Sequence, residues 1–350
     1  MGTGHSTKPR SREAWFGGKS RAAPLIWQAL GNVPNFVDPF FGSGAVLLGR
    51  PYAPGIETVN DKDAYLANFW RAVTTDAEAV AHYADYPPSE PDLHARHAWL
   101  VQQRTALTAR VEGDPDYYDA RVAGWWVWGL CLWIGGGWCA GQGPWQVMDG
   151  QLLHMGDGGQ GIQRQLIHLG DGGQGVHRKL FHMGNGGRGE HAGLLAWFVA
   201  LQQRLRAVRV CCGDWTRVLG PSVTLGNGLT GIVLDPPYSH AERDSALYRI
   251  EADISVEVRE WAIAHGDNPL LRIILCDYGE AAPRMPSSWQ KVCWKTTGGY
   301  GAQGQGRGRA NAHRETLWLS PHCITPGADL FAWAASVRHH ERHGDDDEQR

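Results

Sequence analysis

Residues 231–239 of the chain are Gly-Ile-Val-Leu-Asp-Pro-Pro-Tyr-Ser, an apolar run that stops at an aspartate and two prolines. Such a run predicts a short buried strand that delivers a rigid loop to the edge of a sheet. Proline has no N–H to donate to a neighbouring strand, and it cannot continue a helix. We therefore expect an α/β protein in which this loop has a fixed shape before any ligand arrives.

The residues of this loop suit a flat ring that carries an amino group. The carboxylate of Asp235 can accept one amino hydrogen, and the carbonyl group of Pro236 can accept the second. Tyr238, which follows Pro237, can stack on the face of the ring. The alternative is a Pro-Pro turn with a solvent-facing aspartate and a packing tyrosine, so the prediction of a nucleobase site depends on matching motifs elsewhere in the chain.

Composition and charge restrict the classes of protein to consider. The 350 residues, 43% of them hydrophobic, are enough for a large core, and a net charge of -3 means that any nucleic-acid surface has to be local. The seven cysteines form no CxxC pair, which favours a reducing, cytoplasmic location. The polar N-terminus does not resemble a signal peptide, and no apolar run reaches the length of a membrane helix. We expect no membrane partner.

A second strand-and-turn pattern lies in residues 35–48, NFVDPFFGSGAVLL. It predicts a strand, a glycine turn and the start of a helix, an arrangement that holds nucleotide-like ligands at the carboxyl edge of a parallel sheet. The next predicted strand, 57–60, ends at Asp61, about twenty residues after the turn, where Rossmann-like folds place the acid that binds ribose. The alternative is an ordinary turn, with Asp61 capping a helix over 64–73.

Two further motifs add ligand-binding groups. Residues 15–19 are WFGGK; the two glycines allow a ligand close to the backbone, and Lys19 can meet a carboxylate. A predicted strand over 208–212 is followed by Asp214 and Trp215, an acid beside an aromatic ring, which is what an adenine ring with its amino group needs. The remaining apolar patterns predict helices within 76–110, over 193–206 and over 256–265, and strands over 271–276, 292–295 and 315–320.

The middle of the chain is rich in tryptophan and glycine. Six tryptophans fall within residues 125–145; most are expected in the core, while one or two at the glycine-rich end, such as Trp138, can stack on a base. Residues 151–189 repeat with a period of 14, and Arg164 and Arg178 occupy equivalent places. Rows of stacked turns with these arginines and Arg188 can follow phosphates.

Phosphate binding is one interpretation of the 14-residue repeats. The alternative is a duplicated low-complexity loop, which the composition favours over any specific function. The histidine column that the repeats create matches no zinc or calcium spacing, so we expect no metal site. A separate glycine- and arginine-rich loop, 298–309, which includes Arg307, can also contact a polyanion.

Five motifs together resemble a known family. In order they are WFGGK (15–19), DPFFGSG (38–44), NDKD (60–63), GDW (213–215) and DPPY (235–238). This set is similar to the Dam-type, alpha-group DNA adenine methyltransferases that use S-adenosylmethionine, in particular those of phages or prophages. The resemblance implies a Rossmann-like class I methyltransferase fold, α/β, with a mixed sheet, helices on both faces and an inserted target-recognition region. The implied core consists of residues 1–70 and 205–325, the insertion of 71–204, and the C-terminal tail of 326–350.

The resemblance also assigns roles to residues. Gly17, Gly18 and Lys19 would enclose the methionine end of the cofactor, Asp38 and the turn from Gly42 to Gly44 its amino-acid part, Asp61 its ribose, and Asp214 its adenine amino group. The cofactor site would also include Trp15, Phe40 and Trp215. Asp235, Pro236, Pro237 and Tyr238 would hold the target base. The repeats depart from the family, and Asp38 stands where many relatives have glutamate.

The implied function is methylation of the N6 amino group of adenine in duplex DNA. Because that group is inaccessible inside a duplex, the base has to be flipped out of the stack. The alternatives are methylation of the cytosine N4 amino group or of an RNA base, and an inactive DNA-binding protein with a methyltransferase-like core. A protein-glutamine methyltransferase would also fit Pro-Pro-Tyr, but that group typically has asparagine where this chain has Asp235.

Overall fold

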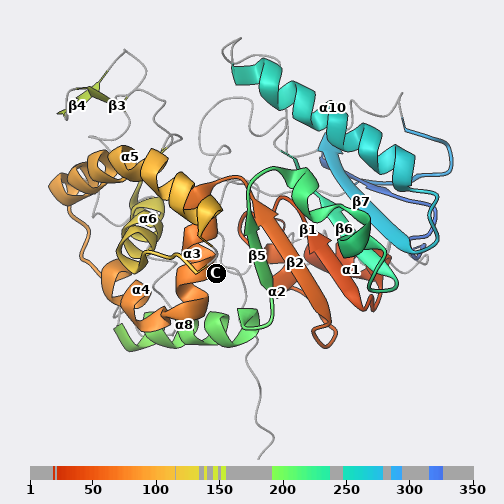
Figure 1. Cartoon of the computed structure of the whole chain (residues 1–350), viewed down its shortest axis with the longest axis horizontal. Coiled ribbons are helices and arrows are strands. Elements are labelled where there is room, and N and C mark those ends of the chain that lie inside the picture. Colours follow the sequence, from red (N-terminus) through yellow and green to blue (C-terminus); the bar gives the residue numbers. More distant parts are fainter. Residues whose placement is uncertain are drawn as a thin grey trace, which may run out of the picture. The chain divides into compact units, whose positions relative to one another are not determined.

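The computed structural model (Figure 1) divides into two compact units. The first unit contains Met1–Ser20, Pro39–Gly49 and Ile56–Gly220, and the second contains Arg21–Asp38, Arg50–Gly55 and Pro221–Arg350. The structure describes residues 19, 22–114, 116–133, 138–139, 145–148, 151–154, 191–236, 247–278, 285–293 and 315–325.

A seven-stranded mixed sheet has the strand order β5-β2-β1-β6-β7-β9-β8. Its strands are β1 (Asn35–Asp38), β2 (Ile56–Asp61), β5 (Arg209–Cys212), β6 (Thr230–Leu234), β7 (Leu271–Tyr278), β8 (Gln290–Cys293) and β9 (Glu315–Leu319). Strand β2 pairs parallel with β5, and β6 pairs parallel with both β1 and β7. Strand β9 runs antiparallel to β7 and β8. The mixed α/β sheet predicted from the sequence is confirmed.

In the second unit, the predicted strand before the Asp-Pro-Pro sequence is β6, and all five of its residues are buried. Complete burial explains why the strand is apolar after Thr230, since both of its faces are covered. The helices of this unit are α1 (Ala23–Leu30), α9 (Pro221–Thr224) and α10 (Leu247–His265). Helix α10 begins at Leu247, well before the predicted Val256. The sequence pattern missed its first turns because polar residues such as Glu251 and Asp253 interrupt the apolar periodicity there.

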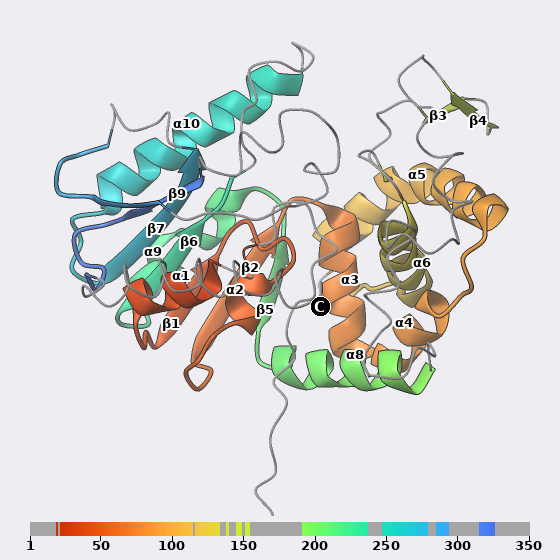
Figure 2. The same cartoon turned by 180° about the vertical axis from the view of Figure 1, so that it is seen from behind.

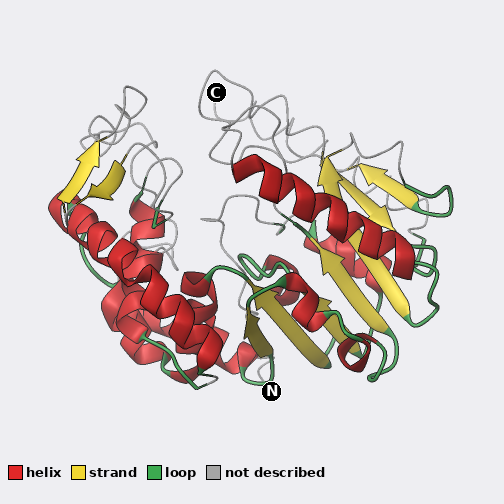
Figure 3. Cartoon of the chain, turned by 45° about the horizontal axis from the view of Figure 1, so that its top comes forward, coloured by secondary structure: helices red, strands yellow, loops and turns green. Residues whose placement is uncertain are grey.

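The first unit contains most of the helices, and Figures 2 and 3 show how they gather beside β2 and β5. They are α2 (Ala45–Leu48), α3 (Ala64–Thr75), α4 (Ala77–Ala84), α5 (Glu90–Gly113), α6 (Ala120–Leu132), α8 (His191–Leu205) and the 3-10 helix η2 (Trp215–Val218). Helices α3, α4, α6 and α8 pack against one another. Strands β3 (Trp145–Met148) and β4 (Gln151–His154) form an antiparallel hairpin.

The tryptophan-rich segment forms α6, and a glycine explains its close packing. A Cβ atom added at Gly124 would lie 2.4 Å from the Cβ atom of Tyr83, so only glycine lets α4 approach α6 this closely. The N-cap of α6 is Asp119, whose carboxylate accepts from the N–H of Val122 at 2.9 Å. Within the described residues, no helix is long and apolar enough to cross a membrane.

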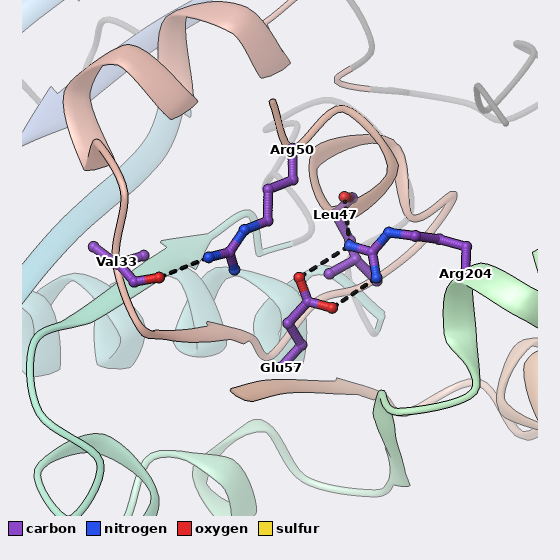
Figure 4. Close-up of polar contacts among 5 residues, drawn as sticks. All are labelled: Val33, Leu47, Arg50, Glu57 and Arg204. Atoms are coloured by element: carbon purple, nitrogen blue, oxygen red, sulfur yellow. Dashed lines mark hydrogen bonds and ion pairs between the residues drawn. The ribbon is translucent and has the colours of Figure 1, made fainter. Parts of the chain in front are cut away.

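A buried ion pair fastens β2 to its neighbouring helices in the first unit. Figure 4 shows the guanidinium group of Arg204, on α8, donating to both carboxylate oxygens of Glu57 at 2.7 and 2.9 Å. It also donates to the carbonyl oxygen of Leu47 at 3.1 Å. The pair therefore links β2, α2 and α8 through one side chain. In the second unit, Arg50 donates to the carbonyl oxygen of Val33 at 2.7 Å.

Candidate functional site

The predicted cofactor loops of the first unit meet at the carboxyl ends of β2 and β5. These strands pair in parallel, with Asp61 opposite Cys212, so the residues that follow each strand emerge at the same edge. The loop 39–44 reaches this edge too, because the N–H of Phe41 donates to the carbonyl oxygen of Asn60 at 2.9 Å. The structure thus brings together three segments that the sequence singled out separately.

The glycine turn is held by side chains of β2 and α3. The N–H of Gly42 donates to Oδ2 of Asp61 at 3.0 Å, and Nε1 of Trp70 donates to the carbonyl oxygen of Gly42 at 3.3 Å. Gly44 has φ 68°, a left-handed conformation that favours glycine. A Cβ atom there would also lie 2.9 Å from the ring of Phe41. Glycine is required at this position by conformation and by space.

Asn60 connects the glycine turn to the Gly-Asp-Trp turn. Its buried Nδ2 atom donates to the carbonyl oxygen of Pro39 at 3.2 Å and to that of Gly213 at 3.0 Å. The N–H of Gly213 donates back to the carbonyl oxygen of Asp61 at 3.1 Å. One carboxamide therefore fixes the spacing between the glycine turn and the Gly-Asp-Trp turn. Sequence patterns assign no separate role to Asn60, although the NDKD motif contains it.

Asp61 accepts two backbone hydrogen bonds in a buried position that disfavours its ionised form. It receives the N–H of Gly42 on Oδ2 and the N–H of Asp63 on Oδ1. Burial nevertheless raises its pKa to about 6, with the nearby Asp63 adding to the rise and the backbone hydrogen bonds opposing it. The alternative of a helix-capping Asp61 is wrong: the N-cap of α3 is Asp63, whose carboxylate accepts from the N–H of Tyr65 at 2.9 Å.

Asp214 and Trp215 follow β5 at the same edge. Oδ1 of Asp214 accepts from the N–H of Thr216 at 3.0 Å and from its hydroxyl group at 2.5 Å, and these bonds lower the pKa of Asp214. The carboxylate is exposed and stays ionised. The buried ring of Trp215 stacks on Phe40, with centroids 6.2 Å apart and planes at 25°. The pair joins the two loops by an aromatic contact.

The predicted base-binding loop belongs to the second unit. Val37 pairs with Ile232 in parallel strands, so Asp38, the last residue of β1, and Asp235, the first residue after β6, both lie at carboxyl ends. Asp38 and Pro236 are buried, and Asp235 is half-buried. Pro237 and Tyr238 lie outside the described residues. The strand before the loop is therefore present as predicted, while the ring-stacking role of the tyrosine stays a prediction.

The remaining predicted residues divide into two groups. Lys19 is buried in the first unit, while the rest of its motif, Trp15, Gly17 and Gly18, lies outside the described residues. So do the predicted DNA-contacting arginines: Arg164, Arg178, Arg188 and Arg307. Among the residues that the structure does describe, no cluster of histidine, cysteine, aspartate or glutamate could hold a metal ion.

Trp138 is placed in a packing role. Its ring is buried, and its Nε1 atom donates to the carbonyl oxygen of Trp126 at 3.0 Å. The ring lies 5.2 Å from that of His97, whose Nδ1 atom accepts from the N–H of Cys139 at 3.4 Å. Burial lowers the pKa of His97 to about 4, so this acceptor nitrogen is unprotonated near neutral pH. These contacts favour the core alternative for Trp138; its DNA contact stays a prediction.

Comparison with known proteins identifies the class of protein to which this region is related. Residues 15–105 match the family described as D12 class N6 adenine-specific DNA methyltransferase, which confirms the resemblance seen in the motifs. The matched segment contains the glycine turn, Asn60 and Asp61; the Gly-Asp-Trp and Asp-Pro-Pro-Tyr motifs lie beyond it.

The chain is also similar to one curated protein, the DNA N-6-adenine-methyltransferase of Escherichia phage P1. It is 32% identical over 98 residues, a segment that covers 27% of this chain and 13% of the phage protein. The chain thus matches only a small part of that relative's length.

Proposed function

We propose that this protein transfers a methyl group from S-adenosylmethionine to the N6 amino group of adenine in duplex DNA. The observation that carries the proposal is the arrangement at the edge of β2 and β5. There Asn60 and Asp61 hold the glycine turn beside Asp214, inside and next to the segment that matches the methyltransferase family.

The residues at this edge fit the adenosyl part of that cofactor. Ribose hydroxyl groups donate most strongly to an ionised acceptor, which Asp61 supplies once its carboxyl group has lost its proton. An adenine amino group needs an exposed acceptor, and the exposed carboxylate of Asp214 is one. Phe40, half-exposed and stacked on Trp215, offers an aromatic face. The cofactor supplies a methyl group already activated by the positive charge on its sulfur.

The loop after β6 would prepare the attacking nitrogen. An exocyclic amino group is a poor nucleophile because its lone pair is delocalised into the ring. In the proposed reaction, Asp235 and the carbonyl group of Pro236 each accept one amino hydrogen, which draws the nitrogen toward tetrahedral geometry and localises the lone pair. Tyr238 stacks on the flipped base. The protein then acts mainly by positioning groups and stabilising charge.

The rest of the chain is proposed to recognise DNA. We propose that residues 71–204 are the inserted target-recognition region, that 1–70 and 205–325 make up the methyltransferase core, and that 326–350 form a tail. Arg164, Arg178, Arg188 and Arg307 are proposed phosphate contacts. The four strand-end aspartates, Asp38, Asp61, Asp214 and Asp235, support an active enzyme over an inactive DNA-binding relative.

Product analysis tests the proposal. The purified protein is incubated with S-adenosylmethionine and unmethylated duplex DNA, the DNA is digested to nucleosides, and the methylated nucleoside is identified by mass spectrometry. We expect N6-methyldeoxyadenosine. N4-methyldeoxycytidine would replace the proposed base, methylation of RNA alone would replace the proposed substrate, and no methylated base with either nucleic acid would reject the enzymatic function.

A further inference from the structure

Helices α5 and α6 of the first unit, which lie side by side in Figure 1, carry alternating guanidinium and indole groups. The guanidinium carbon of Arg121 lies 4.6 Å from the ring centroid of Trp99 and 5.5 Å from that of Trp125. That of Arg96 lies 5.1 Å from Trp125 and 4.2 Å from Trp128. We call these five residues the arginine–tryptophan ladder.

The spacing of the residues explains why the ladder forms. On α6, Arg121, Trp125 and Trp128 follow one another at intervals of four and three residues, so they share one helix face. On α5, Arg96 and Trp99 are three residues apart and face them. The Trp99 and Trp125 rings meet edge to face, with centroids 5.2 Å apart. The ladder is therefore the seam between two helices.

Exposure increases along the ladder from the core to the surface. Trp128 and Arg96 are buried, Trp125 and Trp99 are half-buried, and Arg121 is exposed. The inner arginine thus has a packing role, with its guanidinium group also 4.1 Å from the ring of Tyr86. Arg121 presents a charge to solvent that the two indole rings hold in place.

Arg121 differs from the arginines that stabilise the fold in what its N–H groups contact. Arg71, Arg204 and Arg272 donate to backbone carbonyl groups or to a carboxylate. In the part of the chain that the structure describes, Arg121 makes no hydrogen bond and no ion pair; its contacts are the two indole rings. Nε1 of Trp125 is also buried without an acceptor there. Stacking therefore orients the guanidinium fork and leaves its donors available.

Nearby carboxylates do not neutralise this end of the ladder. Asp119, two residues before Arg121, has its Oδ1 atom on the N–H of Val122 as the cap of α6. Asp92 lies one turn before Arg96 on α5 and acts on that inner arginine. The exposed end therefore carries a positive charge, and a planar guanidinium fork matches the oxygens of a phosphate group or of a carboxylate. The DNA substrate of the proposed function makes phosphate the relevant partner.

We propose that the arginine–tryptophan ladder is a DNA-backbone contact surface, in which Arg121 binds a phosphate group of the duplex and Trp99 holds its guanidinium group in position. This inference rests on the proposed function for the identity of the polyanion. It adds a proposed contact by a described residue, Arg121, to a recognition region whose other predicted arginines lie outside the described residues. The hairpin of β3 and β4, where the histidine and arginine repeats begin, contacts α5 through β4.

Fluorescence anisotropy with a labelled duplex of about 20 base pairs tests the surface, at salt concentrations from about 50 to 200 mM. We expect Arg121→Ala to weaken binding about tenfold and to reduce the slope of log K against log salt by about one. Trp99→Leu keeps the charge, so binding should weaken only about threefold, with an unchanged slope. Thermal melts verify that both variants fold.

The matched control is Arg206→Ala, which removes an exposed arginine just after α8. Arg206 makes no hydrogen bond, ion pair or ring contact with the described residues, so the affinity and slope of this variant should equal those of the wild type. Equal binding by wild type and Arg121→Ala, or an effect confined to RNA, would overturn the inference, as would a wild type that binds no duplex. A wild type that binds DNA through Arg121 without methylating it would reject the proposed function and leave the contact surface standing.

Discussion

Asp61 combines two backbone hydrogen bonds with a pKa raised to about 6. Each bond favours the carboxylate, yet burial outweighs them, so protonation occurs just below neutral pH. Asp61 therefore offers both carboxylate oxygens as acceptors to the proposed cofactor only above about pH 6. The same change in charge weakens the bond from the N–H of Gly42 to Oδ2, which holds the glycine turn.

We predict that S-adenosylmethionine binding depends on pH through this residue. The ionised form binds, so affinity should be constant above pH 6 and fall about tenfold per pH unit as the pH decreases further, because one proton must be lost. Titration calorimetry across this range measures the effect. Asp61→Asn should bind more weakly at every pH and lack the inflection; an inflection that persists in this variant would assign it to another group.

Asn60 offers a second test at this scale. Asn60→Asp keeps the shape of the side chain but turns its donor into an acceptor that faces the carbonyl oxygens of Pro39 and Gly213. We predict a loss of about 1–3 kcal/mol in the free energy of unfolding, since two buried acceptors lose their donor. We also predict cofactor binding at least about tenfold weaker, because the spacing between the loops is no longer fixed.

Denaturant unfolding and calorimetry on the same preparation measure both effects. Asn32→Asp, at an exposed asparagine of the second unit, is the matched control and should change neither quantity. Destabilisation without weaker cofactor binding would limit Asn60 to a structural role.

At the level of elements, the pair of Glu57 and Arg204 joins β2, α2 and α8. We predict that Arg204→Met destabilises the protein by about 3 kcal/mol, because the buried carboxylate loses its partner. The double variant Glu57→Met with Arg204→Met should recover part of the loss. Urea unfolding of the four proteins of this double-mutant cycle measures the coupling. Equal stability of Arg204→Met and the wild type would contradict the assignment.

Most elements were predictable from the sequence because their patterns are local. Strands β1, β5, β6 and β7 follow from short apolar runs that end in polar or glycine residues, β2 follows from its place between the glycine turn and Asp61, and α3 follows from its periodicity. The tryptophan-rich segment carries no such signal: α6 is apolar on nearly all sides, so the contrast between a buried and an exposed face is missing. Its packing depends on contacts with α4, which are distant in the sequence.

The site was predictable in its residue types and less so in its contacts. The spacing of Asp61 from the glycine turn indicated a strand-end acid, but its bond to the N–H of Gly42 depends on the left-handed conformation of that glycine. The tether made by Asn60 joins residues 153 positions apart, which no local pattern reveals. A buried polar residue directly before the strand-end acid was the available signal.

For the whole molecule, we propose that the first unit binds the methyl donor and that the loop after β6 acts on the target base. Cofactor binding and methyl transfer should therefore depend on different residues. Removing the Asp235 carboxylate should impair the proposed chemical step and leave the proposed cofactor site at β2 and β5 unchanged.

The most direct measurement is the transfer of a labelled methyl group from S-adenosylmethionine to duplex DNA by the wild type and by Asp235→Ala, with cofactor affinity determined on the same preparations. We predict transfer by the wild type, and for the variant an unchanged affinity with a turnover at least about a hundredfold lower. Equal turnover by the two proteins, or a wild type that binds the cofactor without methylating DNA, would contradict the proposed function.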